Sequence, residues 1–120
     1  MAQIRHLAIK TKDPERQARF YEDVFDLKVI HRAENAVYMS DGWLTLALLP
    51  NRGNAAPNGI NHFGFVVDDM AEIEERLSRF NEPLTGRPAN PFAERRTIEL
   101  DGNLIDVSVA GYAPAATNQA

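Results

Sequence analysis

The sequence contains no cysteine, so it can form no disulfide and offers no thiolate to a metal ion. This absence suits a reducing compartment, and it restricts any metal site to nitrogen and oxygen ligands. The chain also lacks an apolar run long enough to cross a bilayer. Residues 1–10 lack the charged, apolar and small-residue segments of a signal peptide. We therefore expect a cytoplasmic protein that does not enter a membrane.

Positive charge is scarce as well. The chain has 13 Lys and Arg against 17 Asp and Glu, a formal net charge of −4. Proteins that bind nucleic acids gather Lys and Arg into patches that neutralise phosphates, whereas here the basic residues are scattered among carboxylates. The sequence therefore predicts no nucleic-acid partner. A hydrophobic fraction of 44% and a charged fraction of 25% are typical of an ordinary globular domain.

One sequence unit occurs twice in the chain. The segments IRHLAIKTKD and INHFGFVVDD align with His6 and His62 in equivalent places, 56 residues apart. The Asp-Gly pairs at 41–42 and 101–102 give a similar offset of 60 residues. Two such offsets indicate a duplicated structural module. The boundary between the copies falls in residues 50–59, PNRGNAAPNG, which are rich in turn formers.

Hydrophobic periodicity predicts the same elements in both copies: a strand, a helix and three further strands. In the first copy we expect strands at 4–10, 27–31, 36–39 and 44–49, and a helix at 14–25 that Asp13 caps. In the second copy we expect strands at 60–67, 94–100 and 103–109, a helix at 70–80, and a short extended piece near 83–84. The prediction is one α+β domain over residues 1–111, with modules at 4–49 and 60–111 and a flexible tail at 112–120.

The alternation of side chains along a strand then predicts which residues face the helices. The bulky sides of the strands are expected to pack on the helices; they comprise Leu7 and Ile9, then Phe63, Phe65 and Val67, then Ile105, Val107 and Val109. This phase leaves His6, His62 and Asp106 on the opposite face of the sheet. A histidine in a strand is often only a half-buried polar residue, and Asp106 can also be read as a surface residue after a hairpin turn. Two histidines at equivalent places with a carboxylate on the same face nevertheless favour a metal site.

Four motifs in this order resemble the vicinal oxygen chelate superfamily, which includes glyoxalase I, extradiol dioxygenases and bleomycin-resistance proteins. They are RHLAI, ARFYEDVFDLKV, NHFGFVVDD and DGNLIDVS. The resemblance implies tandem βαβββ modules whose mixed sheet curls around a central cavity, with two helices on the outside. It also implies a small-molecule substrate, a homodimer, and a divalent metal held by the first and last strands of each module.

Carried over by position, the resemblance places the metal ligands on His6, His62 and Asp106, where most relatives have Glu in place of the aspartate. The fourth position falls on Leu46, which cannot bind a metal, whereas glyoxalase I relatives usually have a carboxylate there. Two imidazoles and one carboxylate make up the facial triad typical of non-haem iron(II) centres. We therefore expect Fe²⁺ first, with Zn²⁺, Mn²⁺, Ni²⁺ or Co²⁺ as other possible ions. Glu99, on the penultimate strand, is a candidate general base.

The function expected from this resemblance is that of a small metal-dependent enzyme, either a ring-cleaving dioxygenase or a lyase or isomerase that works through an enolate. A glyoxalase-like isomerase with a reduced ligand set is a further form of this hypothesis. The alternative is a metal-free drug-binding or resistance protein, in which Leu44, Leu46 and Leu48 would form an apolar wall. His31 has no partner in either scheme, and we expect it to face solvent.

Overall fold

The computed structural model describes residues 1–53, 56–86 and 94–112. Its elements in chain order are β1 (Gln3–Thr11), α1 (Pro14–Phe25), β2 (Lys28–Ala33), β3 (Ala36–Ser40), β4 (Thr45–Pro50), β5 (Gly59–Val66), α2 (Met70–Ser78), β6 (Arg95–Ile98) and β7 (Leu104–Ser108). The strands form one mixed sheet in the order β2-β3-β4-β1-β5-β7-β6, which is not closed into a barrel. The predicted α+β class is confirmed. Neither helix among these elements is long and apolar enough to cross a membrane.

The described residues form two compact units, which we call the first unit (residues 6–61) and the second unit (residues 1–5 and 62–112). Their boundary lies within two strands: it precedes His6 in β1 and His62 in β5. Residues 113–120 of the predicted tail lie outside the described part of the chain. The tail prediction is wrong at its first residue, because Tyr112 is buried.

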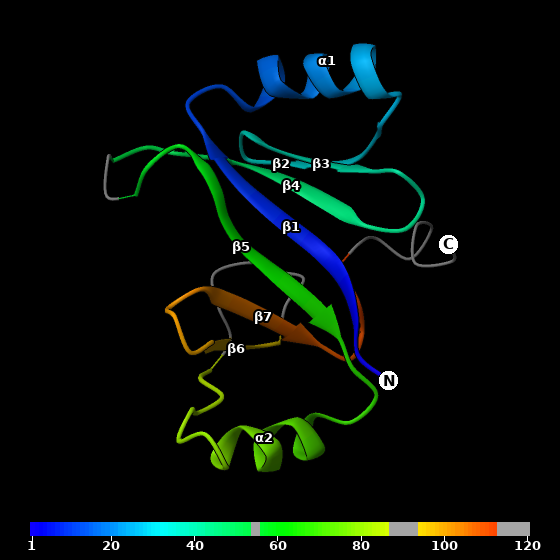
Figure 1. The fold of residues 1–120 in the computed structure, drawn as a ribbon. Helices are drawn as coiled ribbons and strands as arrows, with labels where there is room; N and C mark the ends of the chain where they lie inside the picture. The colour runs from blue at the N-terminus through cyan, green and yellow to red at the C-terminus, as the bar shows by residue number, and fades with distance from the viewer. Residues whose placement is uncertain (54–55, 87–93, 113–120) are drawn as a thin grey trace. The chain divides into compact units, whose positions relative to one another are not determined.

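The first unit has the predicted order of strand, helix and three strands. β1 pairs with β4 in parallel, and β3 pairs with β2 and β4 in antiparallel fashion. Helix α1 lies along one face of β2, β3 and β4 (Figure 1). The core between them is formed by Ala18, Val37, Met39, Leu46 and Leu48, with Leu7 and Ile9 packed against it. The prediction that Leu7 and Ile9 face the helix is confirmed.

Local sequence signals set both ends of α1. The side chain of Asp13 accepts a hydrogen bond from the backbone N–H of Arg16, 3.1 Å away, and Pro14 occupies the first turn. An aspartate in this place satisfies one of the N–H groups that the first turn leaves without a helical partner. Asp26 ends the helix in the left-handed conformation, with φ of 59°. The backbone then turns directly into β2.

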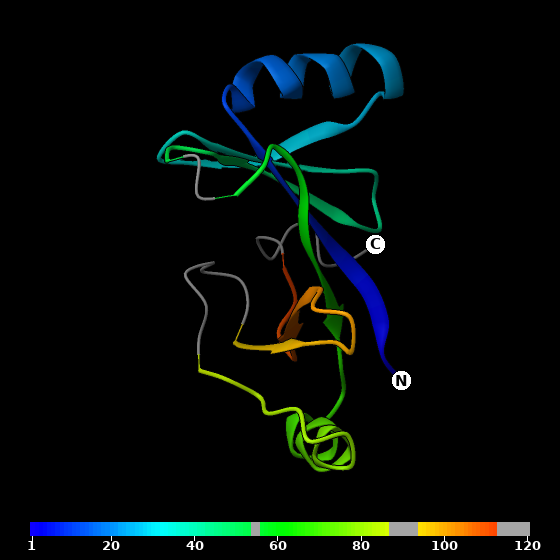
Figure 2. The ribbon, with the colours of Figure 1, turned by 60° about the vertical axis from the view of Figure 1, so that its left-hand side comes forward.

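In its described residues the second unit repeats the strand and helix, and two later strands follow, β6 and β7. β5 pairs with β7 in parallel, and β7 pairs with β6 in antiparallel fashion. Where the first unit has β2 after its helix, the described residues of the second unit have an isolated bridge between Thr85 and Arg96. Figure 2 shows α2 nearly end-on beside β6 and β7. The core between helix and strands is formed by Val67, Leu84 and Val107, with Phe65, Met70, Ile73, Leu77 and Ile105 packed against it.

Several predicted element ends are wrong by one or two residues: β2 runs to Ala33 and β6 stops at Ile98. Helix α2 ends at Ser78, and its following turn tightens, because the N–H groups of Arg79 and Phe80 bond to the carbonyls three residues earlier. Phe80 therefore leaves the apolar stripe and is exposed. β7 ends at Ser108, so Val109 also lies outside its strand and is exposed.

Candidate metal centre

The three residues predicted as metal ligands are all buried. His6 lies in β1 and is fully buried, His62 lies in β5 with 4% exposure, and Asp106 lies in β7 and is fully buried. The residues on either side of them along the strands, such as Leu7 and Ile105, pack in the helix-covered cores. The predicted strand phase is therefore confirmed: the polar residues occupy the face opposite the helices.

His62 and Asp106 contact each other directly within the second unit. Nε2 of His62 lies 3.2 Å from Oδ2 of Asp106. Their strands run in parallel, and the register pairs Gly64, two residues after His62, with Asp106. Because His62 and Gly64 share a face, this register brings the imidazole to the carboxylate.

The other oxygen of Asp106 is held by Arg96. These residues are directly opposite each other on β6 and β7, and Nε of Arg96 donates to Oδ1 of Asp106 at 2.7 Å. Burial favours the neutral acid, but the adjacent His62 imidazole and the hydrogen bond from Arg96 outweigh it and hold the pKa of Asp106 below its ordinary value of 3.8. Asp106 is thus a carboxylate at neutral pH, the form in which it can bind a metal.

His6 completes the group. One ligand atom each from His6, His62 and Asp106 can be chosen so that all lie within 4.8 Å of one another. A pair of imidazole nitrogens and a carboxylate oxygen at such spacing suits one divalent ion. Among the described residues, these are the side chains that could hold a metal.

The fourth metal-ligand position of the family falls on a different residue from the one predicted. The register pairs Gly64 with Asp106 in the second unit and Ala8 with Ala47 in the first, so the residue equivalent to Asp106 is Ala47. The expectation that this position falls on Leu46 is wrong, because Leu46 packs against α1 in the first core. The 60-residue offset between the two Asp-Gly turns is one residue longer than the offset between the strands that follow them. The methyl group of Ala47 offers no ligand either, so the ligand set remains three residues.

Tyr112 covers part of the same face of the second unit. Its hydroxyl donates to the carbonyl of Phe65 at 2.7 Å, and its ring passes so close to Gly64 that an added Cβ would lie 2.7 Å from Oη. Burial, together with the charges of Asp106 and Glu94, raises the pKa of Tyr112 above its ordinary value of 10.0. No periodic pattern in the sequence identifies this residue, because it follows the last strand.

Glu94 fastens the chain segment that leads from β7 to Tyr112. Its carboxylate accepts hydrogen bonds from the hydroxyl of Ser108 and from the backbone N–H groups of Val109 and Ala110. These contacts fix the end of β7, two residues beyond Asp106. Periodicity in the sequence could not identify them, since they depend on how β6 meets the end of β7.

Glu99, the predicted general base, is held in the turn between β6 and β7. Its Oε1 accepts hydrogen bonds from the backbone N–H groups of Asp101 and Asn103 and from the Asn103 side chain, at 2.8–3.0 Å. The hydrogen bonds from Asn103 and Asp101 lower the pKa of Glu99, which weakens it as a base. Arg96, not Glu99, is the β6 side chain that reaches Asp106. Glu99 is therefore a turn-stabilising residue and not part of the proposed site.

His31 also differs from its prediction as a solvent-facing residue. It is half-buried, and its ring centroid lies 5.5 Å from that of Tyr38, the residue opposite it on β3. Tyr38 in turn is opposite Ala47, so these residues share one face of the first unit. The sequence suggested no partner for His31, because the irregular register between β2 and β3 after Val29 determines the pairing.

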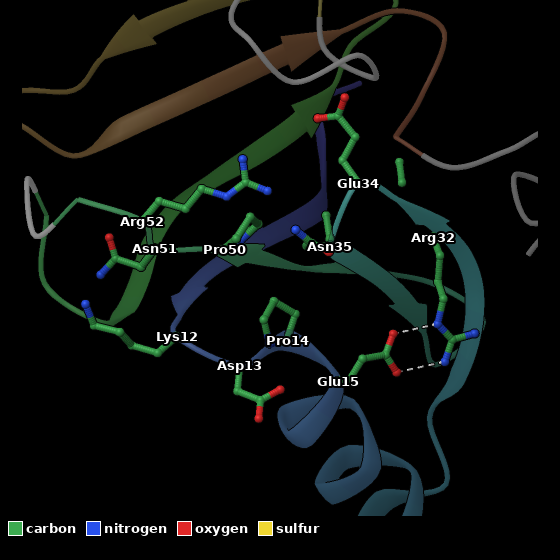
Figure 3. A pocket seen from close by; sticks show the side chains of 12 residues that line it. Lys12, Asp13, Pro14, Glu15, Arg32, Glu34, Asn35, Pro50, Asn51 and Arg52 are labelled. Atoms are coloured by element: carbon green, nitrogen blue, oxygen red, sulfur yellow. Dashed lines mark hydrogen bonds and ion pairs between the residues drawn. The ribbon is translucent and has the colours of Figure 1, made fainter.

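The first unit also has a polar pocket of about 570 Å³ that includes none of the candidate ligands (Figure 3). It lies at the start of α1, beside the turn between β2 and β3 and the end of β4. Glu15 and Arg32 form a paired salt bridge along its side, with Nε to Oε2 at 2.8 Å. Its lining combines three cationic side chains (Lys12, Arg32 and Arg52) with three acidic ones (Asp13, Glu15 and Glu34).

Comparison with known proteins identifies the fold. A family model described as the Glyoxalase/Bleomycin resistance protein/Dioxygenase superfamily matches residues 3–107. No curated protein matches the chain significantly.

Several solved structures have a similar fold. A hypothetical protein, BH1468 from Bacillus halodurans C-125, is 15% identical, with a TM-score of 0.73 over 88% of this chain and 92% of that chain. A methylmalonyl-CoA epimerase in complex with methylmalonyl-CoA and NH4+ is 18% identical, with a TM-score of 0.70 over 95% and 99% of the chains. The 2,3-dioxygenase LapB from Pseudomonas sp. KL28 is 19% identical, with a TM-score of 0.71 over 92% of this chain and 41% of that chain. At these identities the likeness establishes the fold alone.

Proposed function

Because the chain belongs to the glyoxalase/bleomycin resistance protein/dioxygenase superfamily, we propose that it is a metal-dependent enzyme acting on a small molecule with two neighbouring oxygen atoms. The observation that carries the proposal is the buried group of His6, His62 and Asp106, whose ligand atoms lie within 4.8 Å of one another. A cluster of this kind on the sheet face away from the helices makes little contribution to the apolar cores. Its composition suits a function in binding.

The residues fit a divalent ion chemically. Two imidazoles and one carboxylate supply nitrogen and oxygen donors for iron(II), zinc, manganese, cobalt or nickel. The lowered pKa of Asp106 keeps it ionised, and the Arg96 contact to Oδ1 leaves Oδ2 on the side of His62. A hydrogen bond to the second oxygen of a ligating carboxylate is a common means of orienting it.

Such an ion would supply Lewis-acid polarisation of the substrate oxygens. His6, His62 and Asp106 would hold it, and Arg96 would fix the orientation of Asp106. With Ala47 at the position equivalent to Asp106, the protein supplies three ligands, which leaves coordination positions for both substrate oxygens. We propose that the reaction is ring-cleaving oxygenation or an enolate-type lyase or isomerase step, with Fe²⁺ as the favoured ion.

Metal reconstitution followed by a substrate panel tests this proposal. The purified protein is stripped of metal and reloaded without oxygen using Fe(II), Mn(II), Co(II), Ni(II) or Zn(II), with His62→Ala treated in parallel. We expect stoichiometric uptake and a higher melting temperature in the wild type alone. Catechols with dioxygen then report ring cleavage, and hemithioacetals report isomerisation. Absence of uptake and of any thermal shift with all five ions would reject the proposal.

A metal-free small-molecule binding protein of the resistance type is the second candidate. One observation favours it: Arg96 already provides a cation 2.7 Å from the Asp106 carboxylate, so this residue has a charge partner without an ion. The apolar wall expected for such a protein is not supported, because Leu46 and Leu48 lie in the core beneath α1. The same reconstitution experiment separates the two candidates.

Assembly and location remain predictions. We propose a homodimer in the cytoplasm, by analogy with the family and from the absence of cysteine. Light scattering coupled to size-exclusion chromatography, at several protein concentrations, would measure the oligomeric state.

A further inference from the structure

Arg96 connects a buried carboxylate to accessible space. It faces Asp106 across the antiparallel pair of β6 and β7, and its Nε donates to Oδ1 at 2.7 Å. Asp106 is fully buried, whereas the Arg96 side chain is 25% exposed. One edge of the guanidinium group therefore lies on the candidate metal ligand, while the side chain as a whole is partly exposed.

The terminal nitrogens of this guanidinium are not used within the described part of the chain. An arginine has five N–H donors in a planar fork, and the Arg96 side chain contributes its Nε–H to Asp106 while no described residue accepts from its Nη atoms. The neighbouring Arg95 is different, since it donates from Nε to the Thr85 carbonyl and from Nη2 to the Leu84 carbonyl. The two adjacent arginines thus differ. Arg95 donates to backbone carbonyls, whereas Arg96 donates to Asp106 through Nε alone among the described residues.

Charge balance favours an anion at these donors. A divalent ion and the Arg96 guanidinium together carry more positive charge than the Asp106 carboxylate neutralises. A neutral ligand would leave this excess charge in a partly buried place, which is costly. A carboxylate matches the arginine fork in shape and supplies the missing negative charge.

Building on the proposed function, we infer that Arg96 binds a carboxylate on the substrate through its Nη atoms while its Nε positions Asp106. The substrate class is a small molecule that carries one carboxylate beside its two vicinal oxygens. Arg96 thereby selects acids over neutral analogues of the same size. Loss of the contact to Asp106 would weaken catechol and the acids alike, so the difference between them isolates the contact to the substrate carboxylate.

Ligand binding measured by protein NMR tests this role. Zinc-loaded protein is titrated without oxygen with catechol and with 2,3- and 3,4-dihydroxybenzoate, which add a carboxylate to the same pair of oxygens. The variants are Arg96→Gln, Arg96→Lys and the control Arg95→Gln, which removes the same charge from the adjacent residue on the other face of β6. Zinc content and melting temperature are recorded for every sample.

We expect Arg96→Gln to weaken the tighter-binding dihydroxybenzoate at least about tenfold, the loss typical of a charge-assisted hydrogen bond. Catechol affinity should fall less than the affinity for the acid, Arg96→Lys should retain part of the preference for the acid, and Arg95→Gln should retain all of it. Equal losses for catechol and the acids would mean that Arg96 acts through Asp106 alone, and would overturn the inference. Unchanged acid affinity would also overturn it.

A second arm does not depend on the metal. Benzoate and benzamide lack vicinal oxygens and are titrated into metal-free wild type and Arg96→Gln. Preference for benzoate in the wild type, lost in Arg96→Gln, supports the anion site even if no zinc is taken up and the proposed metal function fails. Equal binding of the two compounds by the metal-free wild type counts against the inference, whatever the zinc content.

Discussion

The ring of Tyr112 lies directly over Gly64. Its hydroxyl and Cζ would be 2.7 and 2.8 Å from a Cβ placed on Gly64, closer than such atoms approach in real structures. The hydroxyl is meanwhile held by the Phe65 carbonyl at 2.7 Å. Glycine is therefore required at this point of β5, opposite Asp106 in the strand register.

We expect Gly64→Ala to destabilise the protein by about 1–3 kcal/mol, the usual effect of overpacking, because Tyr112 must move away from Phe65. Urea denaturation followed by circular dichroism measures the free energy of unfolding. Gly53→Ala is the matched control, since no atom of the described residues lies within 4 Å of its added Cβ, and its effect should stay within about 0.5 kcal/mol. Equal stability of Gly64→Ala and the wild type would contradict the close contact.

Tyr112 should also make the fold sensitive to alkali. Burial, followed by the charges of Asp106 and Glu94, raises the pKa of Tyr112 above its ordinary value of 10.0. The folded state therefore holds this proton more tightly than the unfolded state, so its contribution to stability is complete below pH 10 and declines as pH rises further. Absorbance at 295 nm should show a tyrosine that ionises late or only with unfolding.

Tyr112→Phe removes this late component and serves as its control. The variant should lose the hydrogen bond to Phe65 and part of its stability at neutral pH, while its stability should decline less steeply above pH 10 than that of the wild type. An identical alkaline slope in both proteins would show that another group is responsible.

Metal uptake should depend on His62 and not on His31. We expect His62→Ala to fold, since His62 lies on the face opposite the apolar cores, and to lose stoichiometric Zn(II) after dialysis, measured by mass spectrometry of the bound metal. His31→Ala should retain the metal, because His31 packs on Tyr38 in the first unit. Full zinc retention by His62→Ala would remove it from the ligand set, and unfolding of this variant would assign it a structural role.

The strand phase could be predicted from sequence because side chains alternate with a period of two and the bulky residues fall on one side. This alone placed His6, His62 and Asp106 on the same face. The position equivalent to Asp106 could not be predicted, because the turns that precede β4 and β7 differ in length and shift the register by one residue, from Leu46 to Ala47.

The contacts of Arg96 were beyond sequence reasoning for a different reason. Alternation separates Arg96 from Arg95 and Glu99, but it does not say which side meets the candidate site. The pairing of Arg96 with Asp106 decides this, and it depends on the register between β6 and β7. The position of Glu99 on the penultimate strand predicts a general base. In the structure its carboxylate instead accepts hydrogen bonds from backbone N–H groups in the tight turn that follows β6.

Leu46 distinguishes a structural residue from the wall of a binding site. Because it is buried with Ala18 in the core beneath α1, Leu46→Ala should cost about 2–5 kcal/mol in the free energy of unfolding. Leu49→Ala, three residues on and half-buried, should cost only about 1 kcal/mol. Urea denaturation measures both, and ligand titration of the folded proteins shows whether either change affects binding. A small stability loss in Leu46→Ala together with weaker binding of apolar ligands would contradict the core assignment. It would support an apolar binding site lined by the leucines, and with it the metal-free binding function.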